Sequence, residues 1–142
     1  MSRILAVDYG TKRIGLALSD PTRTLASPLP TLTRRAGKRP PWAELNRIVE
    51  ENEVAEIVVG LPLALSGEET AWCAETREFA SDLERRTGRP VQFVDERMTS
   101  VMAERLVRGR GLGKSDREDK SRVDAAAAAI MLQAHLERRK MK

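Results

Sequence analysis

Acidic residues occupy three separate places in the sequence where regular structure is expected to begin or end. Asp8 closes one apolar run, Asp95 and Glu96 close another, and Asp124 lies near the start of an alanine-rich segment. Carboxylates that converge repel one another and raise each other's pKa unless a cation lies between them. Hard oxygen ligands in a small cluster suit Mg²⁺ or Mn²⁺, which retain water and bridge to phosphate. With two ions, one can activate an attacking water while the other stabilises a leaving oxygen.

Each acidic position also has a simpler interpretation. Asp8 could form a local hydrogen bond in a turn, and Asp95 and Glu96 could form surface ion pairs with Arg97. Asp124 could be a first-turn residue that the helix dipole favours, which is the better interpretation when it is taken alone. The set of three positions favours a shared metal site over these separate explanations.

The composition excludes several other kinds of chemistry. Cys73 and His135 are the only cysteine and histidine, so an intrachain disulfide, a protein-only zinc site and Cys–His or Ser–His–Asp catalysis are excluded. No apolar stretch approaches the roughly 20 residues of a membrane span, and the N-terminus lacks the apolar region of a signal peptide. We therefore expect a soluble, cytoplasmic protein that does not associate with membranes.

The distribution of basic residues points to a polyanionic partner. The net charge is only +4, but residues 22–43 contain no acid, and residues 97–142 contain twelve Lys and Arg against six Asp and Glu. Basic segments around acidic candidates suit a nucleic acid that docks by its phosphates. A basic surface without any partner is an equally good reading of the charge alone. Because only 4% of the residues are aromatic, we expect recognition of backbone and shape rather than extended base stacking.

Apolar runs and helical periodicity predict the elements that must position these residues. The order is a hairpin, an edge strand, alternating helices and strands, and two closing helices. This order is that of an α/β RNase H-like three-layer domain, with a mixed five-stranded sheet flanked by helices, and 142 residues suit a single domain over 1–142. We expect strands at 3–8, 13–19, 24–33, 56–60 and 91–95, helices at 42–52, 68–87, 99–108 and 120–139, and a charged, glycine-rich loop at 109–119.

Four motifs resemble those of one family. Residues 8–17 (DYGTKRIGLA) are similar to the opening signature of the YqgF/RuvX family of Holliday junction resolvases and ribosomal RNA processing nucleases. The likeness continues in order through 59–62, 95–100 and 120–124, and it spans nearly the whole chain. The combination of four motifs in this order is highly specific, whereas any one of them would not be.

The resemblance implies an RNase H-like fold in which Asp8, Glu96 and Asp124 are the catalytic, metal-binding carboxylates. Glu96 is preferred because the family's strand-end glutamate precedes an arginine, as it does here. Adjacent residues of a strand face opposite ways, so we expect only one of the two acids at 95 and 96 to join the cluster, with Asp95 as the second choice.

The resemblance also suggests which residues contact the substrate. Lys12, Arg13, Arg97 and Lys120 are candidate partners of phosphates or of the carboxylates, with ordinary ion pairs as the alternative. Thr11 could contribute a hydroxyl or a backbone N–H near a phosphate.

These observations favour a nuclease that uses Mg²⁺ or Mn²⁺, with two ions expected, on structured nucleic acid. The resemblance favours processing of the 5′ end of pre-16S ribosomal RNA, with resolution of branched DNA as the alternative. Two other classes are a non-catalytic nucleic-acid-binding module and an ATP-binding domain of the actin type, although the latter needs two such domains. A homodimer would suit paired cuts on a junction.

Overall fold

The predicted hairpin of residues 3–19 forms, and it lies within a five-stranded mixed sheet in the computed structural model. The structure describes residues 2–34, 39–64, 66–95 and 116–140. The sheet order is β3-β2-β1-β4-β5, in which β3, β2 and β1 are antiparallel neighbours and β4 and β5 run parallel to β1. The strands are β1 (Arg3–Tyr9), β2 (Arg13–Ser19), β3 (Ala26–Thr33), β4 (Val54–Leu61) and β5 (Val91–Asp95).

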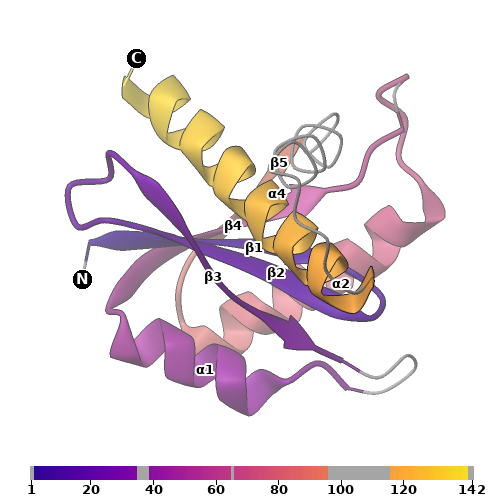
Figure 1. Cartoon of the computed structure of the whole chain (residues 1–142), viewed down its shortest axis with the longest axis horizontal. Coiled ribbons are helices and arrows are strands. Elements are labelled where there is room, and N and C mark those ends of the chain that lie inside the picture. Colours follow the sequence, from indigo (N-terminus) through magenta and orange to yellow (C-terminus); the bar gives the residue numbers. More distant parts are fainter. Residues whose placement is uncertain (1, 35–38, 65, 96–115, 141–142) are drawn as a thin grey trace.

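Helices cover both faces of this sheet (Figure 1). The helices α1 (Trp42–Glu51) and α2 (Ala71–Thr87) pack on one face and provide the long crossovers that parallel strands require. The helix α4 (Asp116–Lys140) crosses the other face and contacts β1, β2 and β3. Within the described part of the chain, no helix is both long and apolar enough to cross a membrane.

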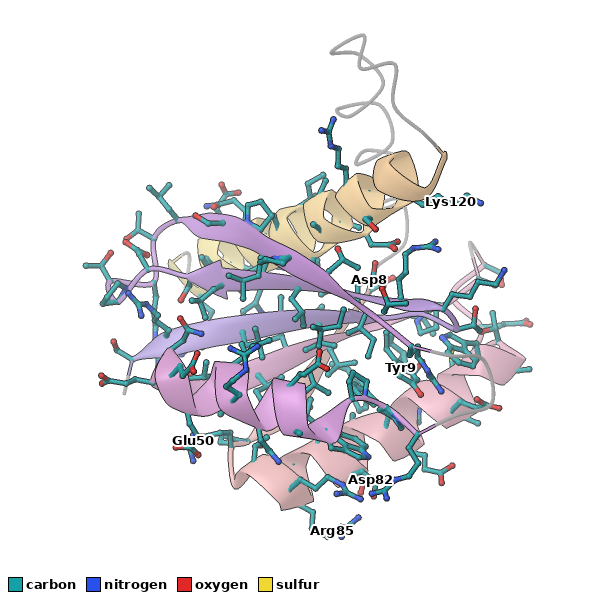
Figure 2. All side chains as sticks on the ribbon, turned by 60° about the horizontal axis from the view of Figure 1, so that its bottom comes forward. Asp8, Tyr9, Glu50, Asp82, Arg85 and Lys120 are labelled. Carbon is teal, nitrogen blue, oxygen red and sulfur yellow. The ribbon has the colours of Figure 1, made fainter. Side chains whose placement is uncertain are left out.

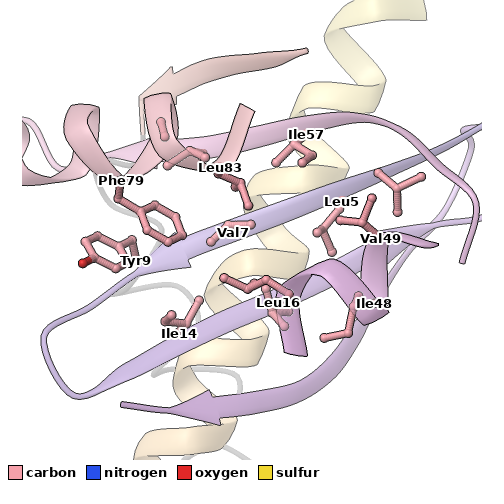
Figure 3. Packing of buried hydrophobic residues seen from close by; sticks show 14 of the residues in the cluster. Leu5, Val7, Tyr9, Ile14, Leu16, Ile48, Val49, Ile57, Phe79 and Leu83 are labelled. Atoms are coloured by element: carbon pink, nitrogen blue, oxygen red, sulfur yellow. The ribbon is translucent and has the colours of Figure 1, made fainter. Parts of the chain in front are cut away.

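Strand alternation divides the buried residues into two layers. In β1, Leu5 and Val7 face α1 and α2, whereas Ile4 and Ala6 face α4. Figure 3 shows the first layer, where large aliphatic and aromatic side chains fill the space beneath the two helices. The second layer mixes aliphatic side chains with small ones, among them Ala6, Ala17 and Ala128. The small residues allow α4 to approach the sheet closely.

Two polar contacts attach α4 to the edge strand β3. The side-chain amide of Gln133 accepts a hydrogen bond from the backbone N–H of Ala26 (2.9 Å) and donates one to the carbonyl of Thr24 (3.0 Å). Nearer the start of α4, the hydroxyl of Thr31 donates to the carbonyl of Ser121 (2.9 Å). The two Gln133 bonds satisfy backbone groups at the start of the edge strand, and together with the Thr31 bond they hold α4 in register with the sheet.

The structure corrects two predictions for this last helix. It begins at Asp116 rather than Lys120, since acidic residues are favoured in a first turn by the helix dipole even within a charged segment. Its buried face is rotated from the predicted set of Val123, Ala127, Ile130, Met131 and Ala134. Ala134 is exposed, Val123 and Ile130 are only partly buried, and the buried residues are Ala127, Ala128, Met131, Leu132, His135 and Leu136. The predicted helix at 99–108 lies outside the described residues.

The turn between β2 and β3 provides a test of pH-dependent stability. The Asp20 carboxylate accepts hydrogen bonds from the Thr22 hydroxyl (2.5 Å) and from the backbone N–H groups of Thr24 (2.7 Å) and Leu25 (3.0 Å). These bonds, led by that from Thr22, lower the pKa of Asp20 from 3.8 to about 2. A carboxyl whose pKa is lower in the folded state stabilises the fold at neutral pH, and this stabilisation is lost as the pH falls from about 4 to about 2.

We therefore expect Asp20→Asn, which cannot ionise, to unfold at a lower urea concentration than the wild type at pH 7. The difference between the two midpoints should shrink as the pH falls from 4 towards 2. Urea titrations at pH 7, 4 and 2.5 measure it, and a difference that is independent of pH would contradict the role assigned to the ionised carboxylate.

Candidate metal and nucleic-acid site

Asp8 lies at the end of β1 on the face that α4 covers. The even-numbered residues Ile4 and Ala6 belong to the layer beneath α4, and strand alternation places Asp8 in the same row. Its side chain is half-buried. Figure 2 shows Asp8 on the side of the sheet towards α4 and Tyr9 on the opposite side, towards α2. In the β1–β2 ladder, the residue paired with Asp8 is Gly15.

At Gly15 the backbone of α4 comes very close to the backbone of the sheet. A methyl group added to Gly15 would lie 2.3 Å from the carbonyl oxygen of Asp124 and 3.2 Å from its Cβ. No side chain can therefore stand between the two elements here. Asp124 therefore lies against the residue that is paired with Asp8 in the β1–β2 ladder, on the face of the sheet to which Asp8 belongs.

Asp124 belongs to the face of α4 that is packed on the sheet. It precedes the buried residues Ala128, Met131 and His135 by four, seven and eleven positions, which is the spacing of one helical face. Since α4 begins at Asp116, Asp124 lies in the third turn. The interpretation of Asp124 as a first-turn residue that only complements the helix dipole is therefore wrong.

Arg13 forms an ion pair with Asp124. The Nε of Arg13 donates to Oδ2 of Asp124 at 2.5 Å, and the two side chains are 27% and 25% exposed. Arg13 begins β2 and lies two residues before Gly15, so it projects from the same face of the sheet. The guanidinium offsets the negative charge of Asp124.

The turn that joins β1 to β2 presents exposed polar groups beside these acids. The backbone N–H of Gly10 donates to the carbonyl of Arg13 (3.0 Å), and a methyl group at Gly10 would lie 2.6 Å from that same oxygen. Only glycine fits this turn without moving the backbone. Thr11 and Lys12, at its tip, are exposed.

Contacts from two other segments, α2 and the residue that follows β3, fix the hairpin tip. The Trp72 indole Nε1 donates to the carbonyl of Tyr9 (3.0 Å). Arg34 donates from its backbone N–H to the carbonyl of Lys12 (2.8 Å), and its side chain donates to the Tyr9 hydroxyl and lies over the Tyr9 ring. Burial raises the pKa of Tyr9, and Arg34 opposes this effect. The tip is therefore held in place while its outer surface stays accessible.

Replacing Trp72 by Phe tests this tether. The Phe ring keeps most of the packing but cannot donate to the Tyr9 carbonyl, so we expect a loss of about 1 kcal/mol in the free energy of unfolding. Urea denaturation measures the loss. Amide hydrogen exchange should also accelerate at Gly10 and Ile14 more than in α1. Equal exchange at both places would argue against a tether.

Four aromatic side chains form a stack beneath this hairpin, on the face away from Asp8. Tyr9 lies 3.9 Å from Phe79 and 5.3 Å from Trp72 between ring centroids, and Phe79 lies 5.4 Å from Trp42. Tyr9, Phe79 and Trp42 are buried. The chain thus uses most of its few aromatic rings in its interior, which agrees with the expectation that base stacking is not its mode of recognition.

The other predicted site residues are distributed as follows. Asp95 ends β5, is exposed, and follows Val94, which faces α4, so alternation directs Asp95 to the face opposite Asp8. Lys120 is exposed one turn before Asp124 (Figure 2). Glu96 and Arg97 lie outside the described residues, and their roles stay predictions.

The described donor set fits a hard divalent cation. Asp8 and Asp124 supply carboxylate oxygens from two different elements, and Mg²⁺ commonly takes one or two protein carboxylates, with water and phosphate completing its shell. Among the described residues there is no group of three or more His, Cys, Asp and Glu side chains arranged to hold a metal. The predicted third carboxylate, Glu96, lies outside this set.

Sequence reasoning did not assign a role to Gly15. A glycine within a predicted strand is itself a signal, because it often marks the close approach of another backbone. Arg122 was also passed over, although its Nη1 is buried without a hydrogen-bond acceptor among the described residues. Nothing in the sequence indicated that this atom would be buried.

The order of the strands, with helices on both faces, defines an RNase H-like fold, as the sequence predicted. RuvC of Thermus thermophilus in complex with a Holliday junction substrate superposes with a TM-score of 0.57 and 18% identity, covering 99% of this chain and 96% of that one. A second structure of Thermus thermophilus RuvC has a TM-score of 0.58 and 16% identity, covering 98% and 96%. At these identities the likeness concerns the fold alone.

The chain belongs to the RuvX family, because the family model, described as Holliday junction resolvase, matches residues 2–138. A relative from Koribacter versatilis is 48% identical over 137 residues, covering 96% of this chain and 88% of its own length. One from Maridesulfovibrio salexigens is 42% identical over 136 residues, covering 96% and 98%. Both carry the name "Putative pre-16S rRNA nuclease".

Proposed function

We propose that this protein is a divalent-metal-dependent nuclease that hydrolyses phosphodiester bonds in structured nucleic acid, and that it trims the 5′ end of pre-16S ribosomal RNA in the cytoplasm. The observation that carries the proposal is the close contact of Asp124 with Gly15, which is the residue paired with Asp8 in the β1–β2 ladder. This contact supports a site at which the two acids, remote in sequence, share one face of the sheet. Two carboxylates with accessible basic groups beside them suit a site for cations and phosphates.

In this proposal Asp8, Asp124 and Glu96 hold one or two Mg²⁺ or Mn²⁺ ions. Such ions, when bound, polarise the scissile phosphate and activate the attacking water. The carboxylates fix the position of the reacting centre relative to the sheet. Asp8 lies on a central strand, and Asp124 lies on a helix that hydrogen bonds attach to the sheet. The distance between the two acids is therefore set by rigid elements rather than by loops.

The basic and hydroxyl groups of the site bind the substrate backbone. Thr11 and Lys12 at the hairpin tip, with Arg13 and Lys120 beside Asp124, are arranged to contact phosphates, and Arg97 completes the set predicted from sequence. These contacts carry no base specificity, so selectivity comes from the shape of the folded nucleic acid.

Two substrates have support. The names of relatives at 48% and 42% identity favour a ribosomal RNA precursor. The family description, Holliday junction resolvase, favours branched DNA. We place the RNA first because it rests on the names of individual relatives at 48% and 42% identity.

A cleavage assay with both substrates tests the proposal. A 5′-extended 16S ribosomal RNA fragment and a four-way DNA junction are incubated with the protein in Mg²⁺, in Mn²⁺ or in EDTA. We expect metal-dependent cutting of the RNA near the mature 5′ end. Faster cutting of the junction would instead support the resolvase activity, and a dimer on the junction would suit paired cuts.

Absence of cleavage of both substrates in either metal would overturn the proposal. Binding without cleavage would then favour the non-catalytic module, and tight ATP binding without cleavage would favour the ATP-binding class. Activity is compared with that of Asp8→Asn prepared in the same way, which excludes a contaminating nuclease.

A further inference from the structure

Arg13 has hydrogen-bonding capacity that its ion pair does not use. Its Nε donates to Asp124 at 2.5 Å, while its two terminal nitrogens have no acceptor among the described residues. The side chain is 27% exposed, so part of it is in contact with solvent. A guanidinium presents five N–H donors in a planar fork, and four of them are on the terminal nitrogens.

The backbone at Arg13 is held as firmly as that of the acids. Its carbonyl accepts the turn-closing bond from Gly10, and the residue pairs with Thr33 in the ladder with β3. With its backbone fixed by the sheet and its Nε fixed by Asp124, the free edge of the guanidinium has a defined direction. A pre-organised fork of this kind matches a phosphate better than a flexible lysine does.

We infer that Arg13 links Asp124 to the substrate, with Nε positioning the carboxylate while the two terminal nitrogens bind a phosphate of the nucleic acid. The inference rests on the proposed function. It adds that a single residue, Arg13, both positions the predicted metal ligand Asp124 and holds a substrate phosphate at a fixed place beside that ligand.

The alternative hypothesis, that the ion pair between Arg13 and Asp124 has only a structural role, predicts a different result. If Arg13 only neutralised Asp124, its loss would expose a negative charge near the nucleic acid and weaken binding by repulsion. Neutralising Asp124 as well would then remove the repulsion and restore the affinity. If Arg13 itself binds phosphate, the affinity stays low after Asp124 has been neutralised.

The experiment measures binding in EDTA, where neither metal nor cleavage contributes. The probes are the fluorescein-labelled four-way DNA junction and the 5′-extended 16S ribosomal RNA fragment. Affinities of the wild type, Asp124→Asn, Arg13→Gln and the double variant are measured at several salt concentrations. Arg85→Gln is the matched control, because it removes the same charge and also breaks a surface ion pair, with Asp82, on the far side of the molecule (Figure 2).

We expect the double variant to bind about tenfold more weakly than Asp124→Asn, the effect of losing one charged hydrogen bond. The slope of log K against log salt should fall by about 0.7 to 0.9, which corresponds to one phosphate contact. Arg85→Gln should change neither quantity. Arg13→Lys in the Asp124→Asn background should keep most of the slope, because the charge remains.

Equal affinity of the double variant and Asp124→Asn would overturn the inference and leave Arg13 as an ion-pair partner alone. This result is separate from a failure of the proposed function, which is recognised when the wild type binds neither probe or cuts neither in the presence of metal. Circular dichroism of each variant confirms that the fold is retained.

Discussion

Asp8→Asn should reduce cleavage by about 1000-fold or more, equivalent to about 4 kcal/mol of transition-state stabilisation. The amide has nearly the same shape as the carboxylate but carries no charge, so it is a much poorer ligand for a hard cation. Asp8 is half-buried at the end of a central strand, and no large cavity or clash results from the exchange. The measurement is the single-turnover rate with the RNA fragment at saturating Mn²⁺.

Binding separates this effect from a loss of structure. In EDTA, Asp8→Asn should bind the probes at least as tightly as the wild type, because one negative charge near the phosphates has been removed. Asp82→Asn is the matched control, since the same exchange is made at another half-buried position, on α2 on the far side of the molecule (Figure 2). A residual rate within tenfold of the wild type would remove Asp8 from the catalytic set.

The strands and the first two helices could be predicted closely because their signals are local. The second and fifth strands were predicted at their observed bounds, Arg13–Ser19 and Val91–Asp95. The buried face of α1 was predicted in full, since Trp42 and Leu45 with Ile48 and Val49 show a clear helical period. The predicted start of α2 was Glu68, whereas the helix begins at Ala71. The polarity of the sequence alone does not distinguish these two starting points.

The side of α4 that is buried against the sheet could not be predicted in the same way. Five consecutive alanines, at 125–129, make every side of the helix equally apolar over more than one turn. Which side is buried is decided by the partner surface, where Ala6, Gly15 and Ala17 leave room for a close approach. This is a tertiary constraint, and it has no signature within the helix itself.

The site shows the same division between local and long-range information. The position of Asp8 at a strand end follows from an apolar run and a turn, both of which are local. The pairing of Arg13 with Asp124 joins residues 111 positions apart, and sequence reasoning left open whether Arg13 contacts a carboxylate or a phosphate. The choice of Glu96 over Asp95 followed the family's strand-end glutamate. The position of Val94 beneath α4 directs Asp95 to the other face, and the role of Glu96 stays a prediction.

Gly15→Ala should impair cleavage by about 100-fold, although it leaves every proposed metal-binding and phosphate-binding group chemically unchanged. The added methyl would lie 2.3 Å from the carbonyl oxygen and 2.7 Å from the carbonyl carbon of Asp124. Both are backbone atoms of a helix, so no flexible side chain can move aside. Restoring an ordinary contact of about 3.4 Å requires α4 to shift by roughly 1 Å, and a misplacement of this size can cost about 100-fold in rate.

The same substitution should lower the free energy of unfolding by about 1 to 3 kcal/mol, as overpacking of a tight interface does. Ala17→Gly is the matched control: Ala17 is fully buried on the same face of the same strand, and its replacement weakens the strand and the packing without moving Asp124. Both variants should unfold earlier in urea, but only Gly15→Ala should lose activity per folded molecule. If the two lose activity in parallel, the defect is one of stability, and the close contact at Gly15 does not position Asp124 for catalysis.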